Sequence, residues 1–419
     1  MSQLLAMNCR CCGVADVELF LDLGDQPHCN RLPAVGSRLP DPRFPLRAGF
    51  CRTCTLVQID HTIPKESMFS DYPYVSGTTK SLAGHFAETA ARLTERFGLG
   101  EDSLVVDIGS NDGTWLKQYA PFGLQVLGVE AAGNVADLAN AAGVRTLNAF
   151  FNADTATRIR DEYGPADLIT AAGVFFHLEE LHSVCEGIEL LLSPDGVFCV
   201  QAIYLGGMIE NCAFDQIYHE HLCYYTLRSL RTLLGRHGLE VFDVSLKAIH
   251  GGTLEALVGR PGAHAVTDAV TRMAQDEQAR GLGELKVYQQ FAERVWSLKR
   301  ELLAVLGAYR QAGKTVYCYG APAKGATLLN SFGIGPDLVE LAVEKSPLKF
   351  GRMIPGVHIP IVDEATVSRP DAYLVLSWNF LDEFLHKERD YLERGGAFIV
   401  PVPSLKVLTA ADLPARTAS

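Results

Sequence analysis

Two stretches of this chain alternate short apolar runs with amphipathic segments. Between about residues 80 and 260 the clearest apolar runs are LVVDIGS, QVLGVEA, DLITAAGV and GVFCVQAI. A second alternation begins with TVYCYGA, just after Gly313, and ends with AFIVPV. Apolar runs of this length, separated by helical stretches, are typical of parallel sheets with crossover helices. The pattern therefore predicts an α/β protein with two Rossmann-like parts.

The remaining stretches follow other patterns. Residues 265–310 are rich in Ala, Gln, Glu and Arg, and their last apolar residues recur at helical spacing, which predicts a connecting helix. Residues 1–75 hold six of the eleven cysteines but show little helical periodicity. The fold of this segment must therefore be stabilised by something other than a large hydrophobic core. We therefore expect a small domain at 1–75, a Rossmann-like domain at 76–264, the helical connector, and a second α/β domain at 311–419.

Composition and charge narrow the possible locations and partners. Apolar residues make up 48% of the chain and charged residues 21%, and no run approaches the roughly 18 apolar residues that a membrane crossing needs. The first residues lack the basic and apolar regions of a signal peptide, so we expect a cytoplasmic protein without membrane contact. A net charge of −12, with Lys and Arg scattered along the chain, disfavours binding to nucleic acid.

The cysteines of the first segment predict a metal site. Two C-x-x-C pairs stand there, Cys9 with Cys12 and Cys51 with Cys54. Two such pairs can close a tetrahedral zinc site, and four thiolates leave no open position for chemistry, so the zinc is expected to be structural. Chance spacing of buried cysteines is the alternative. Cys11 and Cys29 are spare sulfurs, either of which could replace a ligand.

The first Rossmann-like part carries features of an adenosyl-cofactor site. In LVVDIGSNDG a strand ends at Asp107, Gly109 allows close backbone approach, and Asn111 and Asp112 can cap the next helix and supply polar contacts. The next strand ends in Glu130, where an acid can accept hydrogen bonds from ribose hydroxyls. These features predict binding of S-adenosylmethionine. A dinucleotide is disfavoured because Asp112 would repel its phosphates.

A cluster of polar residues follows the predicted strand GVFCVQAI. The segment FDQIYHEHLCYYT places Tyr218, His219, Glu220 and His221 together, where segments after strand ends border the ligand crevice. Neutral imidazole can remove a proton at cellular pH, so we assign His221 as base, Glu220 as orienting or polarising it, and Tyr218 as a substrate contact. His177 follows another strand end. A catalytic metal on H-E-H and a merely structural polar loop are the alternatives.

Motifs spread over nearly the whole chain carry a family resemblance. Besides the cysteine pairs they are GDQPHCNRL, DYPYVSG, DIGSNDGT, FDQIYHEHLCYY, HGGT, YGAPAKG and KFGRMIPGVHIPI. In these the chain resembles the three-domain sugar C-methyltransferases that act on nucleotide-linked 4-keto deoxysugars of natural-product glycosides. The resemblance implies a base in the IYHEH stretch, with roles for Tyr218, Glu220 and His221, for Tyr74 of DYPYVSG and for His177. It also implies that His221 takes the proton at C3, next to the ketone, to form an enolate that receives the methyl group.

The same resemblance implies a nucleotide site in the last domain. GAPAKG opens a helix whose N-terminus, with Lys324 beside it, suits a diphosphate, and Lys349 and Arg352 add positive charge. The expected substrate is a dTDP-linked sugar, and the expected assembly is a monomer or weak homo-oligomer. Gly173, Phe176 and Gln201 depart from the family pattern. They leave open methylation at C5 or of another enolisable carbonyl, and a non-catalytic cofactor-binding scaffold is a rival of a different class.

Overall fold

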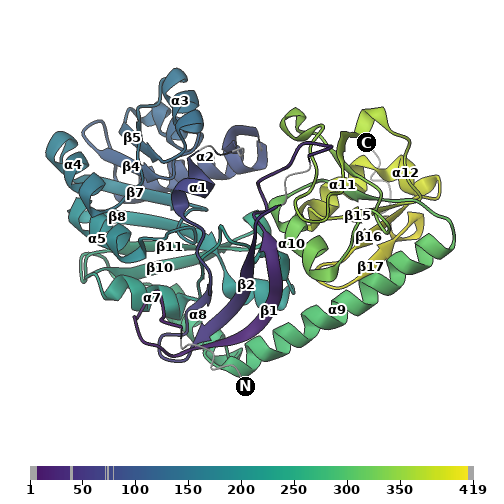
Figure 1. Cartoon of the computed structure of the whole chain (residues 1–419). Coiled ribbons are helices and arrows are strands. Elements are labelled where there is room, and N and C mark those ends of the chain that lie inside the picture. Colours follow the sequence, from purple (N-terminus) through teal and green to yellow (C-terminus); the bar gives the residue numbers. More distant parts are fainter. Residues whose placement is uncertain (1–6, 38–40, 71, 73–74, 79, 414–419) are drawn as a thin grey trace.

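The computed structural model describes residues 7–37, 41–70, 72, 75–78 and 80–413, and it contains three sheets (Figure 1). The first is antiparallel, with strand order β1-β2-β3-β9. Its strands are β1 (Val17–Pro27), β2 (Arg43–Cys51), β3 (Val57–Ile59) and β9 (Cys223–Tyr224). The strand β9 comes from much later in the chain and pairs with β3 directly after the HEH motif, so the N-terminal sheet is joined to the segment that carries this motif.

The second sheet has seven strands in the order β10-β11-β8-β7-β4-β5-β6. Strands β4 to β8 pair in parallel, and β10 and β11 form an antiparallel edge. The strands are β4 (Leu104–Ile108), β5 (Gln125–Glu130), β6 (Thr146–Asn148), β7 (Ala166–Ala172), β8 (Leu192–Ile203), β10 (Glu240–Lys247) and β11 (Thr253–Gly259). All five residues of β4 are buried, as expected for a central strand covered on both faces.

Helices cover both faces of this sheet and connect its strands. They are α1 (Lys65–Phe69), α2 (Lys80–Phe97), α3 (Gly133–Ala141), α4 (Ala153–Tyr163), α5 (Leu181–Leu191), α6 (Leu205–Glu210) and α7 (Leu227–Gly235). The apolar runs that sequence analysis interpreted as strands are strands here, and the parallel core with crossover helices confirms the predicted Rossmann-like class.

The third sheet has the order β14-β13-β12-β15-β16-β17, parallel except for β17. Its strands are β12 (Val316–Tyr319), β13 (Ala342–Glu344), β14 (Ile361–Asp363), β15 (Ala372–Val375), β16 (Ala397–Val400) and β17 (Lys406–Leu408). Its helices are α10 (Ala323–Phe332), α11 (Leu381–Lys387) and α12 (Arg389–Glu393). This part confirms the second predicted α/β alternation.

The predicted connector consists of two helices, α8 (Asp268–Ala279) and α9 (Leu285–Gln311). The 27 residues of α9 span about 40 Å and run along one side of the molecule from the seven-stranded sheet to the third sheet (Figure 1). Gly313, with φ of +66°, lies just past its end. Tyr288 of α9 stacks on Phe50 of β2 with ring centroids 4.7 Å apart, so the helix also holds the N-terminal sheet.

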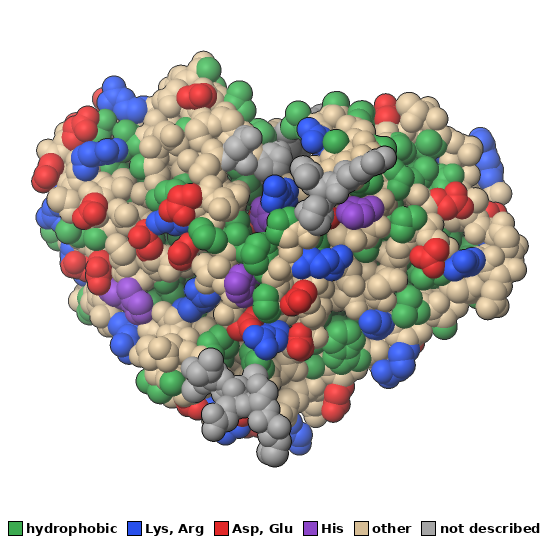
Figure 2. All heavy atoms as spheres, viewed as in Figure 1, with side chains coloured by type: hydrophobic (Ala, Val, Ile, Leu, Met, Phe, Trp, Pro, Cys, Tyr) green, Lys and Arg blue, Asp and Glu red, His purple; other side chains and the backbone are tan. Residues whose placement is uncertain are grey.

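Charged side chains of both signs are interspersed over the face shown in Figure 2, and neither sign forms a stripe. Of the helices in the described part of the chain, none has the length and apolar character that a membrane crossing requires.

Candidate active site

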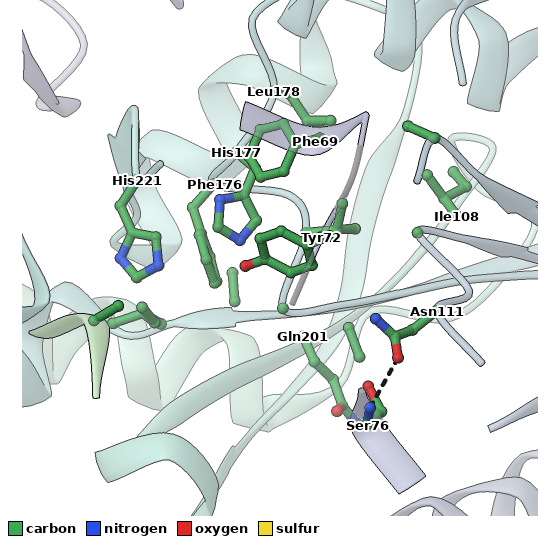
Figure 3. Close-up of a pocket in the computed structure, with 18 of the residues that line it drawn as sticks. Phe69, Tyr72, Ser76, Ile108, Asn111, Phe176, His177, Leu178, Gln201 and His221 are labelled. Atoms are coloured by element: carbon green, nitrogen blue, oxygen red, sulfur yellow. Dashed lines mark hydrogen bonds between the residues drawn. The ribbon is translucent and has the colours of Figure 1, made fainter. Parts of the chain in front are cut away.

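A cavity of about 520 Å³ lies where the three parts of the molecule meet (Figure 3). The N-terminal part contributes Asn30, and the third sheet's domain contributes Lys324 and Lys349. The Rossmann-like part with seven strands contributes most of the wall. Its predicted site residues in the wall are Gly109, Asn111, Glu130, His177, Tyr218 and His221. The structure therefore brings most of the predicted site residues to one cavity.

At one end of the cavity, loops after β4 and β5 form a site that fits an adenosyl cofactor. Gly109 has φ of +68°, and a Cβ there would meet the Val174 side chain at 2.8 Å, so only glycine fits this turn. The Glu130 carboxylate accepts the backbone N–H groups of Asn111 at 2.9 Å and Ala132 at 2.8 Å. Each of its oxygens retains a second lone pair, so the fixed carboxylate can also accept ribose hydroxyls. Burial raises the pKa of Glu130, and the three backbone N–H groups around it oppose that rise.

Two other acids of this motif are turned away from the cavity. Asp107 is buried beneath the loop and accepts the Thr170 hydroxyl at 2.6 Å. Burial raises the pKa of Asp107 to about 7. Asp112 accepts the hydroxyl of Thr114 at 2.5 Å, which organises the turn. Neither acid is among the residues that line the cavity, so both support the loop in this structure.

The ring of His221 is fixed by its neighbours. Its Nδ1 lies 2.8 Å from the carbonyl oxygen of Gln216, and because a carbonyl only accepts, Nδ1 carries the proton. In the neutral ring the lone pair is then on Nε2. Tyr218 packs on the ring with centroids 3.9 Å apart, and Phe176 meets it edge-on at 4.4 Å. This tautomer and orientation suit a general base.

A second histidine lies beside the first. The ring centroids of His177 and His221 are 5.0 Å apart, and Figure 3 shows both with Phe176 and Tyr72. The Nδ1 of His177 donates to the backbone carbonyl of Glu220 at 2.5 Å. Burial lowers the pKa of His177, so its imidazole is kept neutral. The cavity wall thus holds a pair of oriented imidazoles.

The Glu220 side chain points away from His221 and toward the N-terminal part. Its carboxylate accepts hydrogen bonds from His28 at 3.1 Å, Asn30 at 2.7 Å and the Tyr72 hydroxyl at 3.0 Å. Burial opposes its ionisation, but the hydrogen bonds from His28 and Asn30 hold the pKa of Glu220 below its ordinary value. In the structure this carboxylate contacts Tyr72 and not the His221 ring.

Sequence reasoning missed three residues of this network: His28, Asn30 and Tyr72. The first two lie in GDQPHCNRL, which had no assigned role, and the third lies in DYPYVSG, where the role was assigned to Tyr74 instead. Tyr74 lies outside the described residues. His219 faces elsewhere, with Nε2 3.1 Å from the carbonyl of Pro45.

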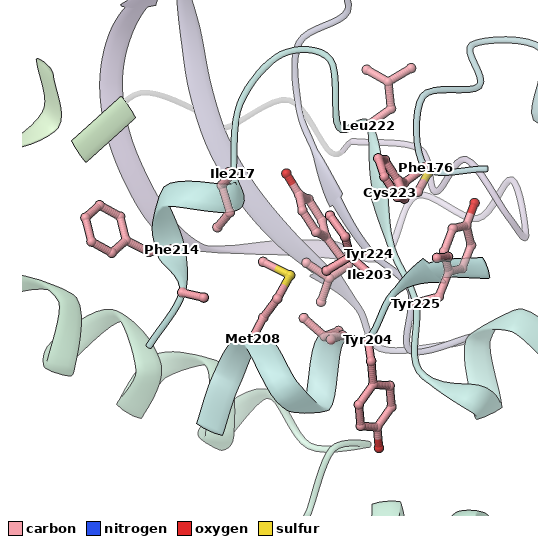
Figure 4. Close-up of a cluster of buried hydrophobic side chains, with 14 of the residues drawn as sticks. Phe176, Ile203, Tyr204, Met208, Phe214, Ile217, Leu222, Cys223, Tyr224 and Tyr225 are labelled. Carbon is pink, nitrogen blue, oxygen red and sulfur yellow. The ribbon is translucent and has the colours of Figure 1, made fainter. Parts of the chain in front are cut away.

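Buried apolar side chains pack behind the segment that carries Tyr218 and His221. Figure 4 shows Met208, Phe214, Ile217 and Tyr224 within this cluster. Phe214 stacks on Phe332 of α10 at 4.9 Å, which ties the segment to the third sheet's domain. Close packing of this kind leaves the segment little freedom to shift.

Two lysines of the third sheet's domain add positive charge to the cavity wall. Nζ of Lys324 donates to Asn379 at 2.6 Å and lies 4.0 Å above the Trp378 ring. Burial lowers the pKa of Lys324 to about 8, although Asp215 opposes that effect. Lys349 also lines the cavity and pairs with Glu344 at 3.2 Å.

Arg352 is not brought to the cavity. Its side chain is exposed, and its backbone forms a bridge with Ala34 of the N-terminal part.

The cysteine pairs meet in the N-terminal part. The Sγ atoms of Cys9, Cys12, Cys51 and Cys54 all lie within 4.8 Å of one another. The backbone N–H of Cys11 points at Cys9 Sγ at 3.4 Å, and that of Cys54 points at Cys51 Sγ at 3.5 Å. Such N–H contacts stabilise thiolates, so the cluster fits a tetrahedral zinc ion. Cys29 lies elsewhere, 3.7 Å from Glu220.

Comparison with known proteins decides the family. Three family models match in order: a zinc binding domain at 9–69, a methyltransferase domain at 82–244, and a C-methyltransferase C-terminal domain at 248–403. The C-methyltransferase NovU of Streptomyces niveus is 37% identical over 413 residues, covering 96% of this chain and 97% of its own. The chain belongs to this C-methyltransferase family. It is an S-adenosylmethionine-dependent enzyme with a zinc-binding N-terminal domain, as the sequence predicted.

Solved structures overlap the C-methyltransferase only in part. The magnesium protoporphyrin IX methyltransferase of Synechocystis PCC 6803 with bound SAH covers 42% of this chain and 82% of its own, with 14% identity and a TM-score of 0.34. The YcgJ protein of Bacillus subtilis covers 42% of this chain and 99% of its own, with 12% identity and a TM-score of 0.33.

Proposed function

We propose that this C-methyltransferase methylates C3 of a dTDP-linked 4-keto deoxysugar through an enolate. The observation that carries the proposal is the orientation of His221. Its ring is fixed with Nδ1 protonated, and it lines the same cavity as Glu130, Lys324 and Lys349. A donor, a base and a cationic anchor are then arranged along a single site.

The cofactor end is assigned to the loops after β4 and β5. Glu130 would accept the ribose hydroxyls of S-adenosylmethionine, and Gly109 and Asn111 would face the rest of the nucleoside. When bound, this cofactor supplies an electrophilic methyl group on a sulfonium sulfur. The chain's contribution is to hold the reacting carbon in line with that methyl group, because alignment lowers the entropic part of the barrier.

The base step is assigned to His221. A ketone at C4 acidifies the C3–H, and Nε2 of His221 removes that proton while Nδ1 remains bound to Gln216. A positioned base typically contributes about 10²–10⁴-fold to the rate. The hydroxyl of Tyr218 is assigned to donate to the developing enolate oxygen, and His177, whose neutral ring has only an acceptor left at Nε2, is assigned to accept from a sugar hydroxyl.

The substrate's nucleotide is assigned to the third sheet's domain. Lys324 in the first turn of α10 and Lys349 would contact the diphosphate, since the helix N-terminus and both ammonium groups favour anions there. The dTDP form comes from the family resemblance. The four clustered cysteines, none of which lines the cavity, are assigned as ligands of the structural zinc.

The test combines methyl transfer with proton exchange. Wild-type enzyme, S-adenosylmethionine and a panel of dTDP-4-keto deoxysugars should give products heavier by one methylene, with the new methyl at C3 by NMR. In D₂O with S-adenosylhomocysteine, the enzyme should exchange the C3 proton without methyl transfer. His221→Asn is the matched variant, because its amide can still donate to Gln216 but has no Nε2 base, and it should lose both activities.

Other outcomes would overturn parts of the proposal. A methyl group at C5, or on another enolisable carbonyl, would refute the C3 assignment. Proton exchange that persists in His221→Asn would refute the base assignment. Tight binding of cofactor without turnover of any ketone would favour a non-catalytic cofactor-binding scaffold.

A further inference from the structure

A loop of the zinc-binding domain enters the active site. Residues 28–30 follow β1, and His28, Cys29 and Asn30 all contact the carboxylate of Glu220. Glu220 belongs to the catalytic segment some 190 residues later, and its side chain is only 1% exposed. We propose that His28 and Asn30 are positioning residues for methyl transfer, acting through Glu220; the inference rests on the proposed function of the same site.

Glu220 is placed to orient two different groups of the cavity wall. Its Oε2 accepts the hydroxyl of Tyr72 at 3.0 Å, and its backbone carbonyl accepts Nδ1 of His177 at 2.5 Å. Both Tyr72 and His177 line the cavity, whereas Glu220 itself does not. A displacement of Glu220 would therefore reach the substrate through two side chains at once.

The carboxylate can fulfil this role only while it is ionised and fixed. A buried carboxylate without donors takes up a proton or moves toward water. Here Oε1 accepts from His28 and Asn30, which leaves Oε2 for Tyr72. The donors from the zinc-binding domain thus keep the negative charge in place and keep Oε2 directed at the tyrosine.

Most of the titratable groups around the Glu220 carboxylate come from outside its own segment. The titratable groups facing it are His28, Cys29, Tyr72, Tyr218 and His177. The catalytic segment itself supplies Tyr218, whose ring packs on His221. The strand β9 begins three residues after Glu220 and pairs with β3 of the N-terminal sheet. This pairing holds Glu220 close to the 28–30 loop.

The experiment compares variants that remove or retain a donor. Asn30→Leu and His28→Leu remove one each, and His28→Gln keeps an amide near the position of Nε2. The control is His358→Gln, because His358 also bonds a carboxylate between domains, that of Asp41 at 2.9 Å, but far from the cavity wall. Zinc content and the affinity for S-adenosylhomocysteine are measured for every variant.

The proposal expects a fall in kcat of about 10- to 100-fold in Asn30→Leu and His28→Leu, as for loss of a hydrogen bond to a buried charge, with unchanged KM for the cofactor and one zinc per chain. His28→Gln should recover most of the rate and His358→Gln should match wild type. Unchanged kcat in both leucine variants, or a loss that parallels loss of zinc, would overturn it.

A second readout keeps this test separate from the proposed function. Infrared difference titration against Glu220→Gln reports the ionisation of Glu220 without turnover. Wild type should show an ionised carboxylate from pH 5 to 8, and the double variant His28→Leu/Asn30→Leu should show the protonated form in that range. If the wild type methylates no keto sugar, the proposed function alone is refuted. If the double variant shows the same titration as wild type, the positioning role alone is refuted.

Discussion

Trp378 donates its indole N–H to the carboxylate of Asp215 at 2.7 Å. Trp378 follows β15 in the third sheet's domain, and Asp215 lies in the segment FDQIYHEHLCYYT of the other Rossmann-like part. Both side chains are buried, and Lys324 lies over the same indole ring. The contact therefore links the segment that carries the proposed base, His221, to the domain proposed to hold the nucleotide.

Removing this link should destabilise the junction. Trp378→Phe keeps an aromatic ring but deletes the N–H, and Oδ1 of Asp215 already has no partner among the described residues. Loss of a hydrogen bond to a buried charged group costs about 1–3 kcal/mol, so the free energy of unfolding should fall by that amount in denaturant titrations. Trp296→Phe, on the half-buried face of α9, is the control and should change it by less than about 0.5 kcal/mol. Equal effects of the two substitutions would contradict the prediction.

The zinc cluster gives a prediction about local stability. Cys12→Ala should abolish binding of one zinc per chain and unfold the N-terminal sheet, because zinc-binding free energies of about 10–16 kcal/mol are coupled to folding in small zinc domains. Amide hydrogen exchange should show lost protection in β1, β2 and β3. Cys185→Ala deletes a buried thiol of α5 outside the cluster and should keep the metal. Retention of stoichiometric zinc in Cys12→Ala would show that the cysteines are not the ligands.

Hydrophobic periodicity was sufficient to predict the Rossmann-like class, because buried parallel strands such as β4 and β5 are continuous apolar runs. It could not predict β9, which is two residues long and pairs with β3 from another part of the chain. Nor could it show that the connector is broken into α8 and α9, since a polar helix end and a short loop have similar composition.

The site residues divide in the same way. The ends of strands placed Glu130 and His177 at the cavity, since strand ends of a parallel sheet share one edge. The direction of a side chain within a loop is not encoded in local spacing, and so Asp112 and Arg352 were grouped with the site although both lie outside the cavity wall. Contacts of His28 and Asn30 with Glu220 depend on domain packing, which no local pattern describes.

Asp107 should make stability depend on pH. Its pKa in the folded chain is about 7 because of burial, against about 3.9 for an unfolded aspartate. Between these values the folded state holds a proton that the unfolded state has lost, so the stability from this group is complete below about pH 4 and declines as pH rises to 7. Asp107→Asn still accepts the Thr170 hydroxyl but does not ionise.

The stability of Asp107→Asn relative to wild type should therefore rise between pH 4 and 7, by at most about 1.4 kcal/mol per unit of pKa difference. Thermal and urea unfolding across that range measure it. The control is Asp195→Asn, because Asp195 is an exposed residue of β8. The free energy of unfolding of this variant should depend on pH in the same way as that of wild type. A constant difference between Asp107→Asn and wild type across the range would refute the raised pKa.

Lys324 should make nucleotide binding depend on pH. Burial lowers its pKa to about 8, and a bound diphosphate favours the charged ammonium form. Above pH 8 binding must then be accompanied by uptake of a proton, so the affinity for dTDP should fall by up to about tenfold per pH unit, measured by calorimetry in buffers of different ionisation enthalpy. Near pH 7 the ammonium is already charged, and the affinity should level off there.

Two variants distinguish the contribution of the Lys324 ammonium to dTDP binding from that of the domain's overall positive charge. Lys324→Met should bind dTDP more weakly at pH 7 and lose the decline above pH 8, because the titrating group is gone. Arg352→Gln removes one positive charge from the same domain, but its side chain is exposed and outside the cavity wall, so both the affinity and its pH profile should be those of wild type. If Arg352→Gln weakens binding and Lys324→Met does not, the nucleotide lies outside this cavity and the proposed cationic anchor is wrong.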